Sequence, residues 1–382
     1  MHYLDHAATT TVRPEAAQAY AAALRVTGNA SSVHAAGRQA RRALEEARER
    51  IAGLLGAAPA EVVLTSGGTE ADALAVMGGA RAGRTRGRDR VVVSAVEHHA
   101  VLDSALALGR EGFDVRRLPV DRDGRVRLDA LEAVDPSTAV VSVMWAGNET
   151  GVVQPLPEVV DAAHRSGALA HTDAVQAVGH VPVDFHGSGV DLLSLSGHKI
   201  GAPAGTGALL VRRDVTIEPL HHGGGQERGL RPGTVDVPGA VALATALESA
   251  VQALPSETPR LRGLRDRLAR GLATLDGVHE SGATLAEEQR LPHIVHAVVE
   301  GADADSLVFA LDRAGIAVSA GAACRAGVQE PSHVIVAMGI GQEHARSGLR
   351  CSLGWDSTDA DVDAFVHSIG DAVERARRAR GR

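Results

Sequence analysis

The sequence is poor in aromatic residues, in cysteine and in lysine. Only 2% of its 382 residues are Phe, Trp or Tyr, so its core must be built from Ala, Val and Leu within a chain that is 45% hydrophobic. Two cysteines, Cys324 and Cys351, cannot form the disulfide framework of a small secreted domain. Residues 1–5 lack the basic and apolar regions of a signal peptide, and no uninterrupted apolar run is long enough to span a bilayer. We therefore expect a cytoplasmic protein with free thiols and no membrane partner.

Charge and length narrow the class of protein further. The chain carries 39 basic and 47 acidic residues, for a net charge of −8. Nucleic-acid binding needs a dense basic face, so we expect no direct nucleic-acid partner. A length of 382 residues is enough for one large and one small domain.

Short apolar runs alternate with helical segments over most of the chain. Residues 35–56 place Leu44, Ala47, Ile51 and Leu54 on one helical face. The apolar runs are rich in Leu or β-branched residues, and the expected strands are 61–65, 91–93, 140–145, 169–171, 192–195 and 208–211. Such strands with helices between them predict an α/β domain whose mainly parallel sheet is covered on both faces.

The pattern changes after about residue 254. Two predicted helices, 237–254 and 259–275, lead into a mixed segment. Strands are expected there at 294–299, 316–319 and 348–353, and helices at 303–314, 332–338 and 359–380. We therefore divide the chain into a large domain, residues 13–254, and a smaller α+β domain formed by residues 1–12 and 255–382.

Lys199 is the only lysine in the chain, and it follows a buried strand in the sequence SGHK, residues 196–199. Burial disfavours the charged form of an amine, and a lowered pKa suits a lysine that forms a Schiff base. An ordinary surface lysine at a strand end would show the same local sequence. However, every other basic residue is arginine, so the one lysine retained suggests a role that arginine cannot fill, such as imine formation.

Two further motifs stand where strands end. Residues 65–70 (TSGGTE) join a strand to a helix, and small residues there allow the backbone N–H groups to approach an anion. Any tight strand-to-helix turn can also be rich in glycine, and no lysine follows as in a P-loop. Asp173, in residues 171–176 (HTDAVQ), would keep a pyridine nitrogen protonated if it lay opposite one. Taken alone, Asp173 fits a turn-capping role equally well.

Taken together in order, the motifs carry a family resemblance. The chain resembles the group I cysteine desulfurases of the NifS/IscS type, within the class V aminotransferase-like enzymes of fold-type I. The matching segments are 3–10 (YLDHAATT), 31–34 (SSVH), 65–70, 97–101 (EHHAV), 148–151 (NETG), 154–155 (QP), 171–176, 196–199, 223–227 (GGGQE), 231–234 (RPGT), 319–324 (SAGAAC) and 350–354 (RCSLG). They span nearly the whole chain.

The resemblance implies a seven-stranded, mainly parallel sheet sandwiched by helices and a pyridoxal 5′-phosphate cofactor held by Lys199 as an imine. Lys199 would also remove the Cα proton of the substrate. The other implied cofactor contacts are Asp173 at the pyridinium nitrogen, Gln176 at the ring hydroxyl, His98 stacked on the ring and moving protons, and Gly68, Thr69, Ser196 and His198 at the phosphate.

The resemblance also implies a substrate site and a second subunit. Asn148 and Arg350 would bind the carboxylate of L-cysteine, the arginine through its bidentate fork. Thr234 would reach the phosphate of the partner subunit in an obligate homodimer.

Cys324 is the expected sulfur carrier. It lies among small residues and glycines in 318–327, which we expect to form an exposed loop rather than strand or helix, and Arg325 beside it favours the thiolate. The spacing to residues 331–334 matches the long-loop, group I form. By contrast, Cys351 lies in a strand-like run and fits a small buried hydrophobic residue.

Four positions depart from the usual family pattern, and none removes a residue assigned to chemistry. His6 stands where Asn is usual, Ala30 where Pro is usual, Pro232 where a small residue is usual and Asp72 where Asn is common. His6 matters most, because the N-terminal segment lies close to the active site in the family.

The implied reaction converts L-cysteine to L-alanine and leaves sulfur on Cys324 as a persulfide for an acceptor or scaffold protein that docks nearby. The acceptor could serve iron–sulfur cluster assembly, thiolation of tRNA or cofactors, or DNA phosphorothioation. A selenocysteine lyase or another class V lyase, and a non-catalytic scaffold, are alternatives. No catalytic metal is expected, because the adjacent pairs His98-His99 and His221-His222 do not face one side.

Overall fold

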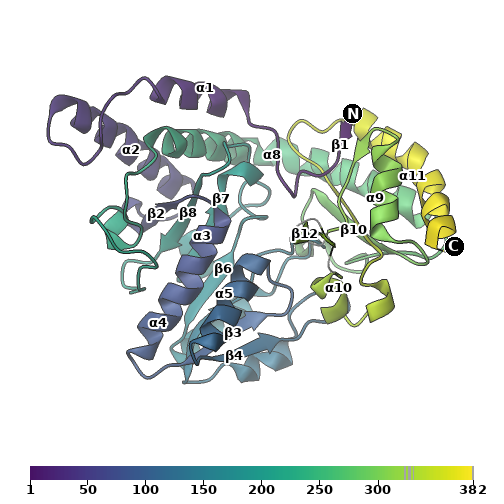
Figure 1. Ribbon diagram of the computed structural model, residues 1–382, viewed down its shortest axis with the longest axis horizontal. Helices are drawn as coiled ribbons and strands as arrows, with labels where there is room; N and C mark the ends of the chain where they lie inside the picture. Colours follow the sequence, from purple (N-terminus) through teal and green to yellow (C-terminus); the bar gives the residue numbers. More distant parts are fainter. Residues whose placement is uncertain (322–323, 326–327, 330, 381–382) are drawn as a thin grey trace.

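A seven-stranded sheet organises the larger part of the computed structural model, which describes residues 1–321, 324–325, 328–329 and 331–380 (Figure 1). The strand order is β2-β8-β7-β6-β5-β3-β4, and only β8 runs antiparallel to its neighbours. The strands are β2 Val62–Thr65, β3 Arg90–Ser94, β4 Asp114–Leu118, β5 Thr138–Ser142, β6 Leu169–Asp173, β7 Leu192–Ser196 and β8 Gly207–Val211. The predicted α/β class with a mainly parallel seven-stranded sheet is confirmed.

Helices cover both faces of this sheet, because its central strands are apolar on both sides and must be buried on both. One face packs against α2 Ala35–Leu54, α6 Leu156–Ser166 and the first half of α8, while α1 Pro14–Ala23 lies on α8. The other face packs against α3 Gly68–Ala73, α4 Gly79–Arg84 and α5 His99–Arg110. A π-helical turn, η2 Leu74–Gly78, joins α3 to α4.

The smaller part of the molecule has its own sheet and core. An antiparallel sheet of order β14-β10-β9 and the parallel pair β1-β11 pack against α9, α11 and the second half of α8. The elements are β1 His2–Tyr3, β9 Val278–Glu280, β10 Ile294–Val299, α9 Ala304–Asp312, β11 Ile316–Ala317, β12 Cys324–Arg325, β13 Val328–Gln329, α10 His333–Ala337, β14 Gly348–Ser352 and α11 Asp359–Arg380. The N-terminal strand therefore completes a sheet built from the C-terminal residues.

Short helices complete the chain. They are α7 Phe185–Ser188 and the 3-10 turns η1 Pro59–Glu61, η3 Leu128–Ala133, η4 Gly197–Lys199, η5 Glu227–Gly229, η6 Glu287–Gln289 and η7 Gln342–His344.

One 37-residue helix, α8 Val237–Ala273, replaces the two helices predicted at 237–254 and 259–275. Pro255 and Pro259 lie inside it, although each proline removes a backbone donor from the helix. Packing compensates, because the first half of α8 lies in the core of the large sheet and the second half in the core of the small one. By length and composition α8 could also cross a membrane, but half of its most apolar window is buried inside the molecule.

Within the large sheet, strands β4 and β5 also differ from the prediction. Strand β4 was not predicted. It lies at the edge of the sheet, and its exposed residues Arg116 and Arg117 interrupt the apolar run that marks the other strands. Strand β5 ends at Ser142, although the apolar run extends to Trp145. Beyond the strand end, the N–H groups of Val143 and Trp145 still donate to the carbonyls of His171 and Asp173 on β6, and Met144 borders the site described below.

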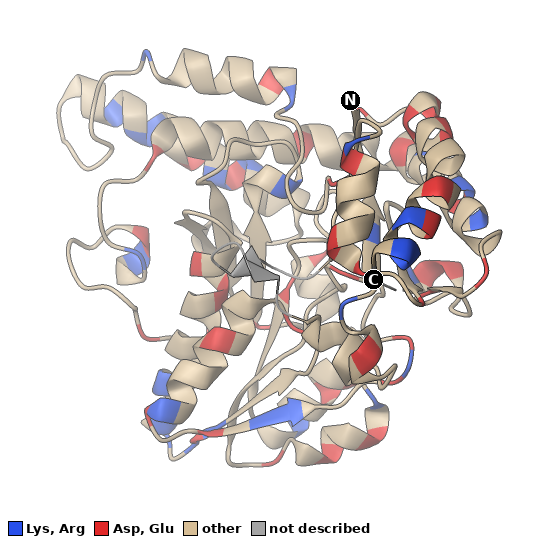
Figure 2. Ribbon diagram, turned by 45° about the vertical axis from the view of Figure 1, so that its right-hand side comes forward, with Lys and Arg blue, Asp and Glu red and all other residues tan. Residues whose placement is uncertain are grey.

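Charged residues of both signs are interspersed over the helices in both parts of the molecule (Figure 2). One ion pair, Arg48 with Glu227, is buried instead, and it connects α2 to η5. Arg48 donates to both carboxylate oxygens of Glu227 at 2.8 and 2.7 Å and to the carbonyl of Val62 at 2.7 Å. Glu227 also accepts from the backbone N–H of Leu64 at 2.7 Å, so the pair fixes strand β2 just before the turn at 65–70.

We expect Arg48→Met to lower the free energy of unfolding by about 3–5 kcal/mol, because it leaves the Glu227 carboxylate buried without its partner. Arg50→Met is the matched control: it breaks the half-exposed Arg50–Glu248 pair on the same helix and should cost less than about 1 kcal/mol. Urea denaturation followed by circular dichroism measures both. Equal midpoints for the two variants would contradict this role of the buried pair.

Candidate functional site

A cavity of about 480 Å³ lies where the carboxyl ends of the large-sheet strands face the smaller part of the molecule. Such strand ends are where α/β folds place ligands. Of the residues predicted for the site, those that border this cavity are Lys199, Asp173, Gln176, His98, Gly68, Thr69, Ser196, His198, Asn148 and Arg350. The fold therefore brings together residues that lie as far apart as 68 and 350 in the sequence.

The lysine reaches the cavity through the turn η4 that follows β7. Its Nζ donates to the backbone carbonyls of Ala7 at 2.5 Å and Ala8 at 2.7 Å. Burial lowers the pKa of Lys199 to about 8, Arg350 lowers it as well, and Asp173 and Asp5 oppose the shift. An amine with this pKa is neutral in a sizeable fraction of molecules near neutral pH, as a nucleophile must be.

Acidic side chains form the floor of the cavity. Asp173, at the end of β6, accepts from the backbone N–H of Val175 at 2.9 Å, and burial raises its pKa to about 6 while Lys199 lowers it. Asp72 on α3 is fully buried, and its Oδ1 has no hydrogen-bond partner and lies 3.6 Å from Nε2 of His171. Burial, with a further contribution from Asp173, raises the pKa of Asp72 well above its usual range.

The turn at 65–70 forms an open helix start beside the amine. Gly67 precedes α3 at a φ of 148° and provides no side-chain cap for the first N–H groups of α3, and the first two residues of this helix, Gly68 and Thr69, border the cavity. A Cβ at Gly68 would lie only 2.8 Å from Cγ2 of Val175. The glycines thus leave room for an anion against the helix N-terminus, beside Thr69 and Ser196.

Arg350 enters the cavity from β14 in the smaller sheet. It donates to the carbonyl of Asn148 at 2.9 Å and to Oδ1 of Asp5 at 2.8 Å, while its Nε is buried without a hydrogen-bond partner. The guanidinium is therefore held in place with donor capacity left over, as recognition of a substrate carboxylate requires.

His98 begins α5, and its Nδ1 accepts from the backbone N–H of Ala100 at 3.1 Å. Burial, with a contribution from Lys199, lowers its pKa to about 4, so the ring is neutral near pH 7. The ring of His99 packs edge to face on His98, and the ring of His333 packs edge to face on His99. Nε2 of His333 lies 3.0 Å from the carbonyl oxygen of Glu97.

Two predicted site residues are not placed in the cavity. Thr234 is exposed on the loop before α8 and does not border it. The backbone of Cys324 pairs with Gln329 in the two-residue strands β12 and β13, where we had expected a loop, while its side chain lies outside the described residues. Cys351 is buried in β14 as predicted, and burial raises the pKa of its thiol.

The sequence did not assign several groups that line the cavity. His99 and Glu149 occur inside the segments that match the family but received no role. Asp5 does not line the cavity, but it also had no assigned role and accepts a hydrogen bond from Arg350, which does. The carbonyls of Ala7 and Ala8 carry no sequence signal at all, since backbone oxygen is present at every residue.

These groups fit pyridoxal phosphate. An amine of lowered pKa, a buried carboxylate at a strand end and an open helix start all border one cavity. They match an aldehyde, a pyridinium nitrogen and a phosphate respectively. Within the described residues, no group of three or more His, Cys, Asp or Glu side chains is arranged to hold a metal ion.

Asp72→Asn should stabilise the protein relative to the parent, increasingly so as the pH rises from 5 to 8. The pKa of Asp72 is higher in the folded state than in the unfolded state. The stability that Asp72 contributes is therefore fully present below its ordinary pKa of about 4 and is lost as the pH rises toward the folded-state value, whereas asparagine does not titrate. Denaturation midpoints across this range test the prediction. The exposed Asp129→Asn is the control and should show a constant difference; a constant difference for Asp72→Asn would contradict the prediction.

Comparison with known proteins agrees with this geometry. The class-V aminotransferase family model matches residues 2–365. An IscS-like cysteine desulfurase from Mycobacterium tuberculosis is 51% identical, covering 99% of this chain and 98% of that protein. A cysteine desulfurase from Gluconacetobacter diazotrophicus is 43% identical, covering 98% and 94%. The solved structure of a NifS-like protein superposes with a TM-score of 0.89 at 35% identity, covering 97% of this chain and 99% of that one.

These matches cover nearly the full length of both chains in each comparison. The chain therefore belongs to the class-V aminotransferase family and is a cysteine desulfurase, a pyridoxal-phosphate enzyme that takes sulfur from cysteine and transfers it to an acceptor.

Proposed function

We propose that Lys199 binds the cofactor covalently, that Asp173 holds its ring nitrogen protonated and that Cys324 receives the sulfur. The observation that carries this proposal is the sole amine side chain of the protein, half-buried at one cavity with a carboxylate and an open helix start. When bound, pyridoxal phosphate supplies an electron sink that acidifies the Cα proton of cysteine.

The remaining side chains bind and orient. When the cofactor is bound, Gln176 would hold its ring hydroxyl, His98 would contact the ring and move protons, and Gly68, Thr69, Ser196 and His198 would hold the phosphate. Asn148 and Arg350 hold the substrate carboxylate, since the buried Nε of Arg350 lacks a partner. Lys199, once displaced by substrate, removes the Cα proton through Nζ, for which a pKa of about 8 is well suited.

Sulfur transfer needs no outside oxidant. The thiolate of Cys324 attacks the sulfur of the bound cysteine, an S–S bond forms and the Cβ–S bond breaks. The bonding pair stays on the substrate carbon, which takes up a proton and leaves as alanine. The products are alanine and a persulfide on Cys324, and the atoms and electrons of cysteine and one thiol balance.

We further propose a cytoplasmic homodimer in which Thr234 contacts the phosphate in the partner subunit. Its exposure outside the cavity of its own chain supports this arrangement. An acceptor or scaffold protein would dock near Cys324. The domain division is 13–254 against 1–12 with 255–382, supported by the two cores that meet along α8.

Borohydride reduction of the holoenzyme should fix one cofactor per chain at Lys199. Because the chain has no other lysine, only the amine of Met1 competes, and mass spectrometry of the two peptides separates them. Lys199→Ala is the control and should retain no reduced cofactor. An adduct at Met1 alone, or none, would defeat the assignment of Lys199.

Cys324→Ala should reduce multiple-turnover alanine formation by roughly a hundredfold or more, because no thiol remains to accept the sulfur. The visible absorbance of the cofactor should persist. Cys351→Ala is the matched control: its thiol is buried, so turnover should be retained and only stability should fall, by about 1–2 kcal/mol. Unchanged turnover in Cys324→Ala would refute the sulfur-carrier role.

A further inference from the structure

The acceptors of the lysine amine belong to the N-terminal segment 6–10, which crosses the edge of the cavity. Lys199 donates to the carbonyls of Ala7 and Ala8, and the side-chain amide of Gln176 donates to the same Ala7 oxygen at 3.0 Å. The segment therefore presents two fixed carbonyls to the one amine on which the chemistry depends.

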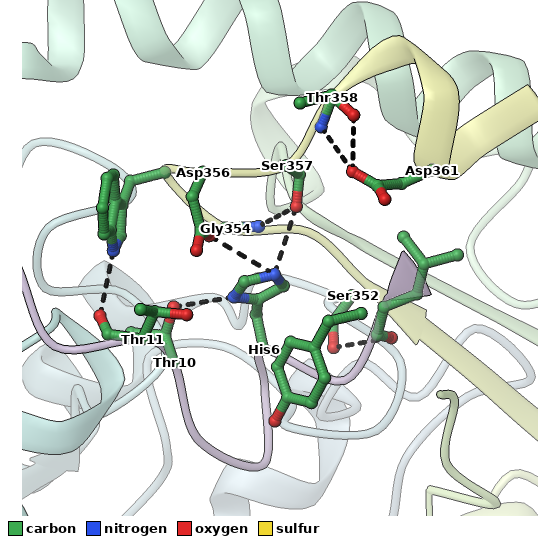
Figure 3. A network of polar contacts seen from close by, with 12 residues as sticks. His6, Thr10, Thr11, Ser352, Gly354, Asp356, Ser357, Thr358 and Asp361 are labelled. Carbon is green, nitrogen blue, oxygen red and sulfur yellow. Dashed lines mark hydrogen bonds and ion pairs between the residues drawn. The ribbon is translucent and has the colours of Figure 1, made fainter. Parts of the chain in front are cut away.

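The imidazole of His6 ties this segment to the smaller part of the molecule (Figure 3). Its Nδ1 lies 2.7 Å from Oγ1 of Thr10, and its Nε2 lies 3.2 Å from Oγ of Ser357 and 3.7 Å from Oδ1 of Asp356. The ring is only 4% exposed. Both ring nitrogens are engaged, one within the segment and one across to the turn 354–358.

The surrounding structure is shaped around this ring. A Cβ at Gly354 would lie 2.1 Å from Nδ1 of His6, so only glycine fits there. The N–H of Gly354 donates to Oγ of Ser357 at 2.8 Å, and the ring of Tyr3 packs edge to face on His6 with 4.8 Å between centroids. Beside the ring, the N–H of Ala7 donates to Oγ of Ser352 at 2.8 Å.

We propose that His6 is a positioning residue for the Lys199 amine: by locking segment 6–10 to the turn 354–358, it holds the carbonyls of Ala7 and Ala8 at Nζ. The inference rests on the proposed role of Lys199. Hydrogen bonds from a cation to fixed acceptors are stronger than neutral ones, and they offset part of the cost of burying the charge. The amine thus has a defined place at the cavity edge whenever it is not bonded to cofactor.

The other charged or titratable groups that face the amine come from several elements, and they are Arg350, Asp173, Asp5, His98 and His198. A substitution at His6 removes none of them. Burial lowers the pKa of His6, and Asp356 opposes that shift, so the neutral ring acts as a hydrogen-bonding brace. Displacing the two carbonyls would therefore chiefly remove stabilisation of the charged form of Lys199.

The single lysine permits a direct test on the full-length chain freed of cofactor. Trace labelling with acetic anhydride across a range of pH, quantified by mass spectrometry, reports the titration of Lys199, with the exposed Met1 amine as internal reference. In His6→Ala the midpoint should fall by about one pH unit, and labelling near pH 7 should rise about fivefold. His279→Ala is the matched control, since His279 contacts Glu300 and neither segment 6–10 nor the turn 354–358, and should leave the midpoint unchanged.

Local or global unfolding would give the opposite sign, because a solvated lysine titrates near 10.4. A midpoint that is unchanged in His6→Ala, or that moves upward, overturns the proposal. If circular dichroism shows that His6→Ala does not fold, Thr10→Val and Ser357→Ala test the proposal in its place. Each variant removes one hydrogen-bond partner of the His6 ring, and each should lower the Lys199 midpoint by less than one pH unit. Unshifted midpoints in both overturn it as well. Borohydride fixation at Lys199 tests the proposed function separately, so the two failures are distinguishable.

Discussion

The structure depends on the cost of burying one ammonium group. Lys199 is held at the mouth of β7 by two backbone carbonyls and faces the carboxylates of Asp173 and Asp5, which together offset part of its desolvation. The offset is incomplete, and the remaining penalty appears as a pKa of about 8. A fully compensated amine would stay charged and unreactive, and an uncompensated one would destabilise the fold.

The groups that surround the Lys199 amine come from both parts of the molecule, which meet at one cavity. Asp173 comes from the large sheet and Arg350 from the small one, while the carbonyls come from an N-terminal segment tied to the small sheet by β1 and Ser352. The continuous helix α8, whose halves lie in the two cores, sets how these parts meet. Its two prolines are tolerated because packing along its whole length outweighs two missing helical hydrogen bonds.

The sequence could predict what depends on side-chain identity. Apolar runs revealed six strands of the large sheet, and the single lysine and ordered motifs led to most of the cavity. It could not predict strand β4, whose arginines face solvent at the sheet edge, nor the helix that runs through Pro255. The carbonyls of Ala7 and Ala8 were inaccessible in principle, because their role comes from where the fold places the backbone.

The family resemblance leads us to expect asparagine at positions 6 and 72, and the titratable residues that stand there, His6 and Asp72, share one property. An amide is an uncharged group that both donates and accepts hydrogen bonds. Burial favours the neutral form of each replacement, lowering the pKa of His6 and raising that of Asp72. A neutral imidazole and a protonated carboxyl each offer one donor and at least one acceptor, as the amide does. Desolvation thus favours the uncharged form of both side chains, which is the form closest in charge to an amide.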